Sequence, residues 1–333
     1  MRPSPGFLLR LVLIAFLALL AFTVWQVFKP VRSEQIVLRV SSGDSAAGIA
    51  ARLEEQGIIE SRFLFKTLAK LRRTDRRLMA GTYTLGGKAS LYQTLSVLEK
   101  GNTSSVRVTI PEGLSLRRTL QRIEQSGLAG YDELLAAATD TAFVREQTGY
   151  KVPSLEGFLY PETYLFDLSL GPREILALMT REFFTKNRAV GIDPHAIAGF
   201  YDKLILASIV EKESAHPQER GIVASVMQNR LNHGMHLASC ATVDYILERR
   251  NIKRPVLTLA DTQIPSPYNT YINTSLPPGP ICNPSLSSIQ AALNPAKTKY
   301  LYFVADRKGR NDFSTTAEEH YRKTRKYRRA EWE

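Results

Sequence analysis

The sequence is poor in the side chains that most often bind metals. Its 333 residues include only two cysteines and five histidines, and no histidines are spaced as zinc ligands. It also lacks a Gly-rich phosphate loop and the Gly-x-Ser-x-Gly turn of many serine hydrolases. We therefore expect no metal and no cofactor. Cys240 and Cys282 could form a disulfide in an oxidising compartment or both stay free, and the sequence leaves both possibilities open.

The composition is that of a folded protein with an excess of positive charge. Hydrophobic residues make up 44% and charged residues 23% of the chain, which suffices for a substantial core. The length allows two domains. The net charge of +12 favours acidic partners such as nucleic acid, anionic lipid or an acidic cell-wall polymer. The chain carries no RNA- or DNA-binding motif, so we expect no nucleic-acid partner.

The N-terminal region contains one long apolar run. Residues 11–28 carry no charge, and as a helix they are long enough to cross a bilayer. We therefore predict a transmembrane anchor over residues 11–30, with lipid contact through residues 11–28. A cleavable signal peptide is the alternative, but it has a shorter apolar core and a small-x-small cleavage site. Basic residues flank the run on both sides, so we place residues 1–10 in the cytoplasm mainly because the segment resembles a signal anchor.

Two stretches of the chain resemble each other, residues 40–58 and residues 110–128. Each has a β-like run, a glycine turn, a serine suited to cap a helix and a closing glycine. A third stretch, residues 90–101, is looser and lacks the preceding β-like run. Chance similarity of two capped helices is one interpretation. The pair also resembles LysM units, which bind N-acetylated sugars, and we interpret residues 36–130 as a LysM-like accessory region.

Helices and loops alternate in the rest of the chain. Periodicity and turn residues predict the following segments: mainly helix over 131–190 around a loop at 151–164, helices over 194–213 and 219–231, a loop over 262–284, a β-like run over 300–305 and a turn over 306–311. This order predicts a mixed α and β domain.

Two glutamates, Glu211 and Glu213, end the apolar helical segment 204–210. At about 100° per residue they point in different directions, so we expect one to face solvent and the other the apolar interior. A carboxyl beside apolar surface has a raised pKa and becomes a usable general acid. Spacing alone does not choose between the two, and a solvated helix end is the alternative for both.

Two loops carry residues suited to a sugar ligand. Tyrosine and asparagine occur together in residues 268–271, followed by the stiff proline-rich turn 276–281. An aromatic ring covers the apolar face of a sugar, and an amide bonds its hydroxyl or acetamido groups. Residues 155–164 mix aromatic side chains with two acids, and we expect them to line a cleft. A packed surface loop is the alternative for residues 268–281.

Several segments, in one order, resemble the endolytic murein transglycosylase family of bacteria (MltG-like, or YceG-like). They are residues 156–164, 206–213, 224–231, 268–271, 276–281, 295–298 and 300–306. The resemblance implies an α+β protein with an N-terminal transmembrane helix, a small LysM-like α+β module and a mixed α/β catalytic domain over residues 131–333. It also implies a single-pass protein of the cytoplasmic (inner) membrane whose catalytic domain lies outside the cytoplasm.

The family's catalytic glutamate is the second of a Glu-Lys-Glu motif, which corresponds to Glu213 here. The implied reaction is cleavage of the MurNAc-GlcNAc β-1,4 bond of nascent peptidoglycan strands, which leaves 1,6-anhydro-MurNAc ends and limits strand length. Peptidoglycan synthases are the protein partners implied. Within the matching motifs, the residues expected to bind substrate are Glu156, Tyr160, Glu162, Asn229, Tyr268, Asn269 and Thr270. A non-catalytic peptidoglycan-binding or scaffold protein of the cell envelope is the alternative.

The chain departs from the family pattern at two places. The family usually has Asp-Pro-Thr-Val where this chain has Cys240-Ala-Thr-Val243, and it usually has glycine where this chain has Ser275. Any role that the family's aspartate plays is therefore not filled by a carboxylate at position 240.

Overall fold

The computed structural model describes residues 5–41, 43–75, 77–101, 105–306 and 308–329. The chain divides into two compact units. The first unit consists of Met1–Val106 with Leu165–Ser169, and the second of Arg107–Tyr164 with Leu170–Glu333. The first four residues of the predicted cytoplasmic N-terminus lie outside the described residues.

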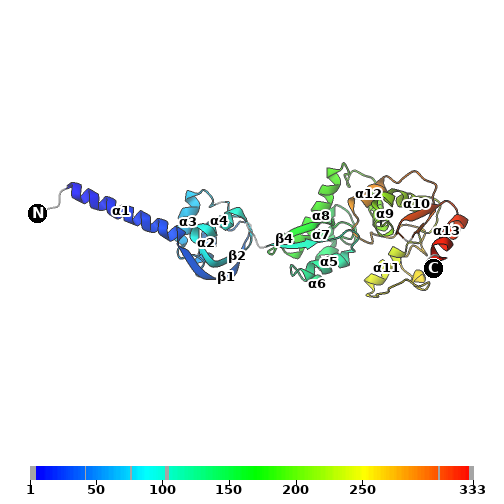
Figure 1. Ribbon diagram of the computed structural model, residues 1–333, viewed down its shortest axis with the longest axis horizontal. Coiled ribbons are helices and arrows are strands. Elements are labelled where there is room, and N and C mark those ends of the chain that lie inside the picture. The colour runs from blue at the N-terminus through cyan, green and yellow to red at the C-terminus, as the bar shows by residue number, and fades with distance from the viewer. Residues whose placement is uncertain (1–4, 42, 76, 102–104, 307, 330–333) are drawn as a thin grey trace. The chain divides into compact units, whose positions relative to one another are not determined.

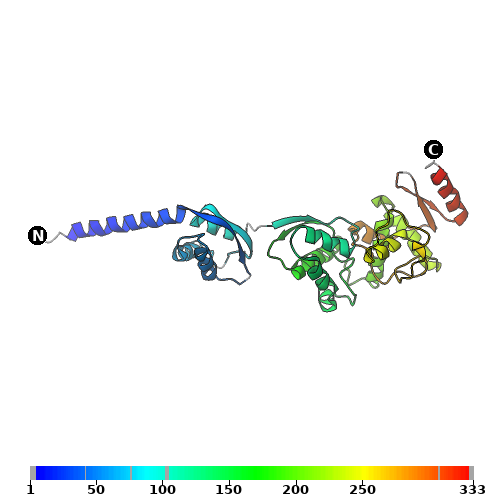
Figure 2. The ribbon, with the colours of Figure 1, turned by 90° about the horizontal axis from the view of Figure 1, so that it is seen from below.

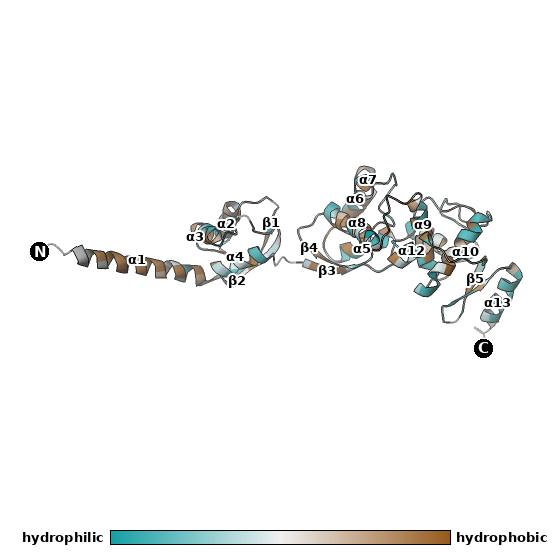
Figure 3. Cartoon of the chain, turned by 90° about the horizontal axis from the view of Figure 1, so that it is seen from above, coloured by the Kyte–Doolittle hydropathy of each residue, from teal (hydrophilic) through white to brown (hydrophobic). Residues whose placement is uncertain are grey.

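The N-terminal apolar run forms one helix, α1 (Pro5–Phe28). Apolar residues cover α1 along its length (Figure 3). Its 18-residue segment Leu11–Phe28 is long and apolar enough to cross a membrane, and none of this segment is buried in the protein. The predicted span over residues 11–28 therefore coincides with a suitable helix.

The rest of the first unit is a two-stranded sheet with three helices. Its elements are β1 (Pro30–Val40), α2 (Ala46–Glu55), α3 (Arg62–Leu71), β2 (Gly81–Ser90) and α4 (Leu91–Lys100). The strands pair antiparallel, with Pro30 opposite Ser90 and Val40 opposite Gly81 (Figure 1). Fully buried side chains from α2, α3 and β2, including Leu53, form a core of this unit alone.

The repeated pattern in the sequence corresponds to capped helices. Ser45 accepts a hydrogen bond from the Gly48 amide at the start of α2. Ser115 does the same from the Arg118 amide at the start of α5 (Leu116–Gln125). The two copies do not form one module, because α2 lies in the first unit and α5 in the second. Residues 90–101 lack a β-like run before them in the sequence, yet the structure has strand β2 there, which leads directly into the capping box of α4.

The remaining elements follow in chain order. They are β3 (Ser105–Thr109), α6 (Tyr131–Thr139), α7 (Thr141–Thr148), β4 (Thr163–Asp167), α8 (Pro172–Ala189), α9 (Phe200–Glu213), η1 (Pro217–Glu219), α10 (Arg220–Asn232), α11 (Cys240–Arg249), η2 (Asp261–Gln263), α12 (Leu286–Leu293), β5 (Tyr302–Ala305), β6 (Asn311–Ser314) and α13 (Ala317–Arg329). β3 pairs with β4, and β5 pairs with β6 as an antiparallel hairpin beside α13 (Figure 2). Neither β4 nor β6 was expected from the sequence.

Helix α9 is the central helix of the second unit. Its residues 204–210 are all buried, and it packs against α10, α11 and α12. The predicted end at Glu213 is confirmed, but the helix begins at Phe200 rather than Pro194. Gly199, in the left-handed region at φ 67°, directly precedes the helix, and residues 194–199 form turns. A helix with apolar surface on every side fixes the position of the residue at its end.

Candidate active site

Glu213 is the last residue of α9, and its carboxyl points toward the start of α11. The hydroxyl of Ser239 donates a hydrogen bond of 2.5 Å to Glu213 Oε1. The backbone amide of Ala241 donates a second one. Ser239 is the N-cap residue of α11, so the carboxyl is held at the N-terminus of that helix.

Burial raises the pKa of Glu213 above the usual range of a glutamate, because protein atoms replace the water that would solvate its charge. The hydrogen bonds from Ser239 and Ala241 and the charge of Arg230 act in the opposite direction, and the nearby Asp244 charge adds to the rise. Burial is the largest of these effects. A carboxyl in this environment stays protonated to a higher pH and is suited to donate a proton.

The expectation that one glutamate of the pair faces solvent is wrong. The Glu211 side chain is only 6% exposed and lies 2.9 Å from the Arg220 guanidinium. It also accepts hydrogen bonds from the Ser285 amide and from the hydroxyls of Ser285 and Ser288. The intervening Lys212 is the exposed residue. Glu211 therefore joins the end of α9 to α10 and α12, while Glu213 faces α11.

Asn269 and Thr270 are fully buried beneath the Ser239 loop. The Thr270 hydroxyl accepts a 3.0 Å hydrogen bond from the Ser239 amide, and its carbonyl accepts one of 2.9 Å from Ala238. The Asn269 amide donates to the carbonyls of Thr262 and Ile264 at 3.0 and 2.8 Å. Both side chains hold backbone in place, and they position the residue that hydrogen-bonds to Glu213.

The turn before α11 contains a backbone conformation that is uncommon for its residue type. Ala238 has φ 48°, in the left-handed region that non-glycine residues seldom adopt. Its amide bonds to Thr270 and its successor Ser239 bonds to Glu213. The surrounding hydrogen bonds therefore maintain a local strain at the residue before the Glu213 partner.

Glu156 is a buried carboxyl that joins α5 to α11. It accepts hydrogen bonds of 2.7 Å from the Leu116 amide and 3.0 Å from the Tyr245 hydroxyl. Burial raises the pKa of Glu156 to about 8, so the group is largely neutral at pH 7. The Tyr245 ring lies 5.1 Å from that of Tyr268, centre to centre. The structure thus brings Glu156 and Tyr268 together through Tyr245.

The other predicted site residues make contacts that do not involve Glu213. Tyr160 is half-buried with the Lys186 ammonium 5.7 Å from its ring centre, and Glu162 forms a 3.2 Å ion pair with the same lysine. The Asn229 amide donates to the carbonyls of Thr298 and Tyr300, at 3.0 Å each. No hydrogen bond of the described residues joins these three side chains to Glu213.

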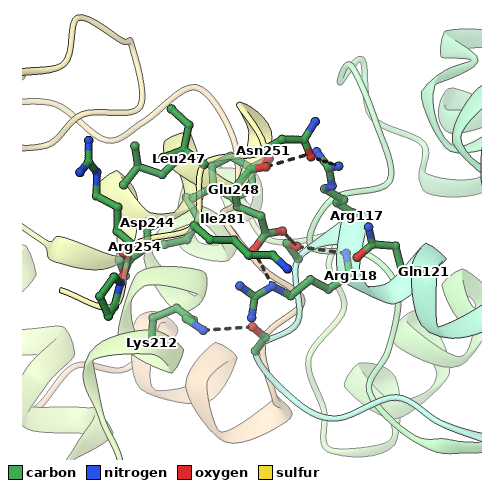
Figure 4. Close-up of a pocket in the computed structure, with 17 residues that line it drawn as sticks. Arg117, Arg118, Gln121, Lys212, Asp244, Leu247, Glu248, Asn251, Arg254 and Ile281 are labelled. Atoms are coloured by element: carbon green, nitrogen blue, oxygen red, sulfur yellow. Dashed lines mark hydrogen bonds and ion pairs between the residues drawn. The ribbon is translucent and has the colours of Figure 1, made fainter. Parts of the chain in front are cut away.

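A cavity of about 510 Å³ opens beside the end of α9 (Figure 4). Its walls come from α5, Lys212, α11 and residues 251–255, and they include Ala241, whose amide binds Glu213. Tyr245 also lines it. The cavity therefore adjoins the candidate acid and has the size of a ligand site.

The two cysteines are not paired. Cys282 is buried, whereas Cys240 is exposed, with its Sγ 3.0 Å from the Tyr271 hydroxyl. Among the described residues, no group of three or more His, Cys, Asp or Glu side chains is placed to hold a metal ion.

Ser239 and Tyr245 belong to the site but were not predicted from the sequence. Ser239 directly precedes and Tyr245 closely follows residues 240–243, where the chain departs from the family pattern. That departure was the one feature of the sequence that could have drawn attention to them. Their contacts with Glu213 and Glu156 span 26 and 89 residues of sequence. Contacts over such separations leave no spacing pattern in one sequence.

The chain is similar to known proteins over most of its length. A model described as the YceG-like family matches residues 38–326. The endolytic murein transglycosylase of Bacillus subtilis (strain 168) is 30% identical over 313 residues, which cover 87% of this chain and 84% of the relative. The endolytic murein transglycosylase of Streptococcus pneumoniae serotype 2 is 31% identical over 325 residues, which cover 86% of this chain but 57% of the relative.

The chain is also similar to a protein of solved structure. The crystal structure of a YceG-like protein from Listeria monocytogenes shares 32% of its sequence with this chain, with a TM-score of 0.57. The match covers 87% of this chain and 99% of the other.

Proposed function

The chain belongs to the YceG-like family, and we propose that it is a lytic transglycosylase that cleaves peptidoglycan strands at internal bonds. The proposal rests chiefly on one observation. Glu213, the second glutamate of the family's Glu-Lys-Glu motif, is held by Ser239 at the start of α11 and has a pKa raised by burial. The names of the two bacterial relatives support the same activity.

In the proposed reaction, Glu213 acts first as an acid and then as a base. Its protonated carboxyl gives a proton to the glycosidic oxygen, and the bond between that oxygen and C1 of the MurNAc residue breaks. The ionised Glu213 then takes the proton of the 6-hydroxyl of the same sugar. The 6-oxygen bonds to C1, which closes a 1,6-anhydro ring and returns Glu213 to its protonated form. One carboxyl thus serves both steps, unlike the pair used by most glycoside hydrolases.

Other residues are proposed to serve the site indirectly. Tyr268 is half-buried and shares a contact with Tyr245 on the cavity wall, so it is a candidate to cover a sugar ring. Asn269 and Thr270 are proposed as positioning residues, because they are buried and hold the Ser239 loop. Glu156 is proposed to set the distance between α5 and α11. Tyr160, Glu162 and Asn229 remain predicted substrate contacts.

The test of this function is digestion of purified sacculi by the full chain in detergent, with mass spectrometry of the products. We expect 1,6-anhydro-MurNAc ends, and a loss of about 10²–10⁴-fold in rate for Glu213→Gln. Glu146→Gln is the matched control, because Glu146 is exposed. Reducing ends in place of anhydro ends would identify a hydrolase. Retention on sacculi without any released fragment would identify the wall-binding alternative.

We also propose that the protein is anchored in the cytoplasmic membrane. Helix α1 supports a single membrane span. The second unit is proposed to lie outside the cytoplasm. Protease treatment of intact spheroplasts tests this topology, because only an external second unit is degraded.

The first unit is proposed as a LysM-like glycan-binding module, now limited to residues 36–106. Its antiparallel strand pair and separate core support this interpretation. Peptidoglycan synthases remain the expected protein partners.

A further inference from the structure

The cavity beside Glu213 is lined by an excess of positive charge. Its basic residues come from α5, the end of α9 and the segment after α11, whereas its acidic residues come from α11 (Figure 4). The basic lining residues are Arg117, Arg118, Lys212, Lys253 and Arg254. The acidic lining residues are Asp244 and Glu248. Seven charged side chains around one cavity leave three positive charges unbalanced, which favours an anionic ligand.

Part of this charge is already neutralised within the protein. Arg118 forms a 2.7 Å ion pair with Glu248, and Arg254 forms one of 2.9 Å with Asp261. Arg117 donates to the Glu248 carbonyl at 3.2 Å and to the Asn251 side chain. These guanidinium groups therefore serve to fix the cavity walls.

Two ammonium groups are left to bind a ligand. Lys212 is exposed, and its ammonium lies 3.4 Å from the Gly113 carbonyl. Its charge acts on Asp244, but among the described residues no carboxylate lies within ion-pair distance of it. Lys253 is exposed too, and in the described part of the chain no carboxylate lies within ion-pair distance of it. An ammonium without a fixed partner donates readily to a carboxylate that enters the cavity.

The cavity and Glu213 lie close enough together to contact the same stretch of a bound glycan strand. Lys212 directly precedes Glu213, and Ala241 lines the cavity while its amide binds the Glu213 carboxyl. Asp244 on the cavity wall is close enough for its charge to affect Glu213. An anion bound in the cavity therefore lies close to Glu213, which fits a charged group carried by a sugar next to the cleaved bond.

We propose that this cavity binds carboxylates of the peptide stem carried by the sugar next to the cleaved bond, with Lys212 and Lys253 as the specificity-determining residues. This inference rests on the proposed function. In a peptide-bearing strand the lactyl group of each MurNAc is joined to the stem by an amide bond, so the carboxylates of the strand belong to the peptide stems. The cavity therefore selects strands whose stem carboxylates are free over strands whose stem carboxylates have been converted to amides.

The test compares the full chain with the double variant Lys212→Gln/Lys253→Gln on two substrates. One is purified peptide-bearing strand, and the other is the same material with its stem carboxylates converted to amides. For the peptide-bearing strand we expect KM to rise about tenfold with kcat little changed, because two charge pairs are lost. For the amidated strand we expect wild type and variant to have the same KM. The charge-matched control is Lys151→Gln/Lys299→Gln, both exposed and in the second unit.

The outcomes separate this inference from the proposed function. If the wild type cleaves both substrates with equal KM, or the variant loses activity on both alike, the peptide-stem site is wrong although the enzyme is a transglycosylase. If the wild type releases no anhydro fragment from either substrate, the proposed function itself has failed. A second measurement uses full-length Glu213→Gln and a soluble disaccharide-tetrapeptide with free or amidated carboxyl groups. Tighter, salt-sensitive binding of the free-acid form supports the site, and equal binding of both forms contradicts it.

Discussion

At the scale of single residues, the chemistry of Glu213 depends on opposing effects. Burial raises its pKa, and the hydrogen bonds from Ser239 and Ala241 lower it. The role proposed for Glu213, to donate and then recover a proton, needs both effects, since burial favours the acid form and the hydrogen bonds stabilise the carboxylate that follows. The site therefore balances the two protonation states rather than maximising either.

Removal of the Ser239 hydroxyl should shift this balance. In Ser239→Ala the carboxylate loses a 2.5 Å hydrogen bond, so the pKa of Glu213 rises further. We expect kcat to fall about tenfold, the effect of losing one charge-assisted hydrogen bond. The limb of the kcat–pH profile that reports ionisation of the acid should move to higher pH. An equal fall in kcat with an unmoved profile would mean that Ser239 has only a structural role.

Glu156 should make the second unit less stable as pH rises. Its pKa is about 8 in the folded protein and ordinary in the unfolded chain, so the folded state holds the proton more tightly. The stability conferred by the protonated group is complete below about pH 4.5 and is lost as pH rises toward 8, by up to about 1.4 kcal/mol per pH unit.

Glu156→Gln isolates this effect, because glutamine imitates the protonated acid. Its carbonyl accepts from Leu116 and its amide donates to Tyr245. We expect urea unfolding to show similar stability for the two proteins at pH 5 and a growing advantage of the variant up to pH 8. A constant difference across this range would show that Glu156 ionises normally.

At the scale of elements, α9 is fixed by a buried charge cluster on the side opposite Glu213, its proposed catalytic residue. Arg220 lies between Glu211, at 2.9 Å, and the more exposed Glu112, at 3.7 Å. Serines at the start of α12 supply the remaining hydrogen bonds to Glu211. The cluster prevents rotation of the end of α9, which keeps Glu213 aligned with Ser239.

Breaking this cluster should destabilise the second unit strongly. Glu211→Ala leaves the Arg220 guanidinium, whose side chain is 8% exposed, without its nearest counter-charge. We expect a loss of about 3–5 kcal/mol in the free energy of unfolding, measured with urea in detergent. The double variant Glu211→Ala/Arg220→Ala should lose less than the sum of the two single variants. Strictly additive losses would show that the pair does not act as a unit.

At the scale of the whole molecule, each of the two units has its own hydrophobic core. One lies within the first unit around Leu53, and the other surrounds α9 in the second unit around Leu204. All the residues proposed for catalysis belong to the second unit. The first unit is therefore free to serve in glycan binding without contributing to the chemistry.

Core variants test this division in the full chain. Leu53→Ala should destabilise the first unit by about 2–5 kcal/mol, because a fully buried leucine leaves a cavity. Hydrogen exchange followed by mass spectrometry should show faster exchange in the first unit only, with weaker retention on sacculi and normal cleavage of short soluble strands. Leu204→Ala, the matched change in the other core, should accelerate exchange in the second unit and abolish cleavage. The same exchange response to both variants would contradict the division.

Much of the local structure was predictable from the sequence. The end of α9 at Glu213, the serine caps of α2 and α5, the loop over residues 262–284 and the strand within residues 300–305 all follow from short-range patterns. Strands β4 and β6 were missed because each is short and depends on a partner strand for its hydrogen bonds. The prediction that one glutamate of the pair faces solvent was wrong for a similar reason, because Glu211 is buried against Arg220, which lies on another helix.

The sequence by itself determined that this chain has an apolar N-terminal helix, a mixed α and β remainder and a glutamate at the end of a buried helix, because periodicity and capping act within a few residues. The tertiary structure alone decided which carboxyl meets α11, how Ser239, Asn269 and Thr270 support it, and that a basic cavity adjoins it. These features arise from packing between segments far apart in the chain. The pKa of a buried carboxyl depends on that packing, so it is set only once the chain has folded.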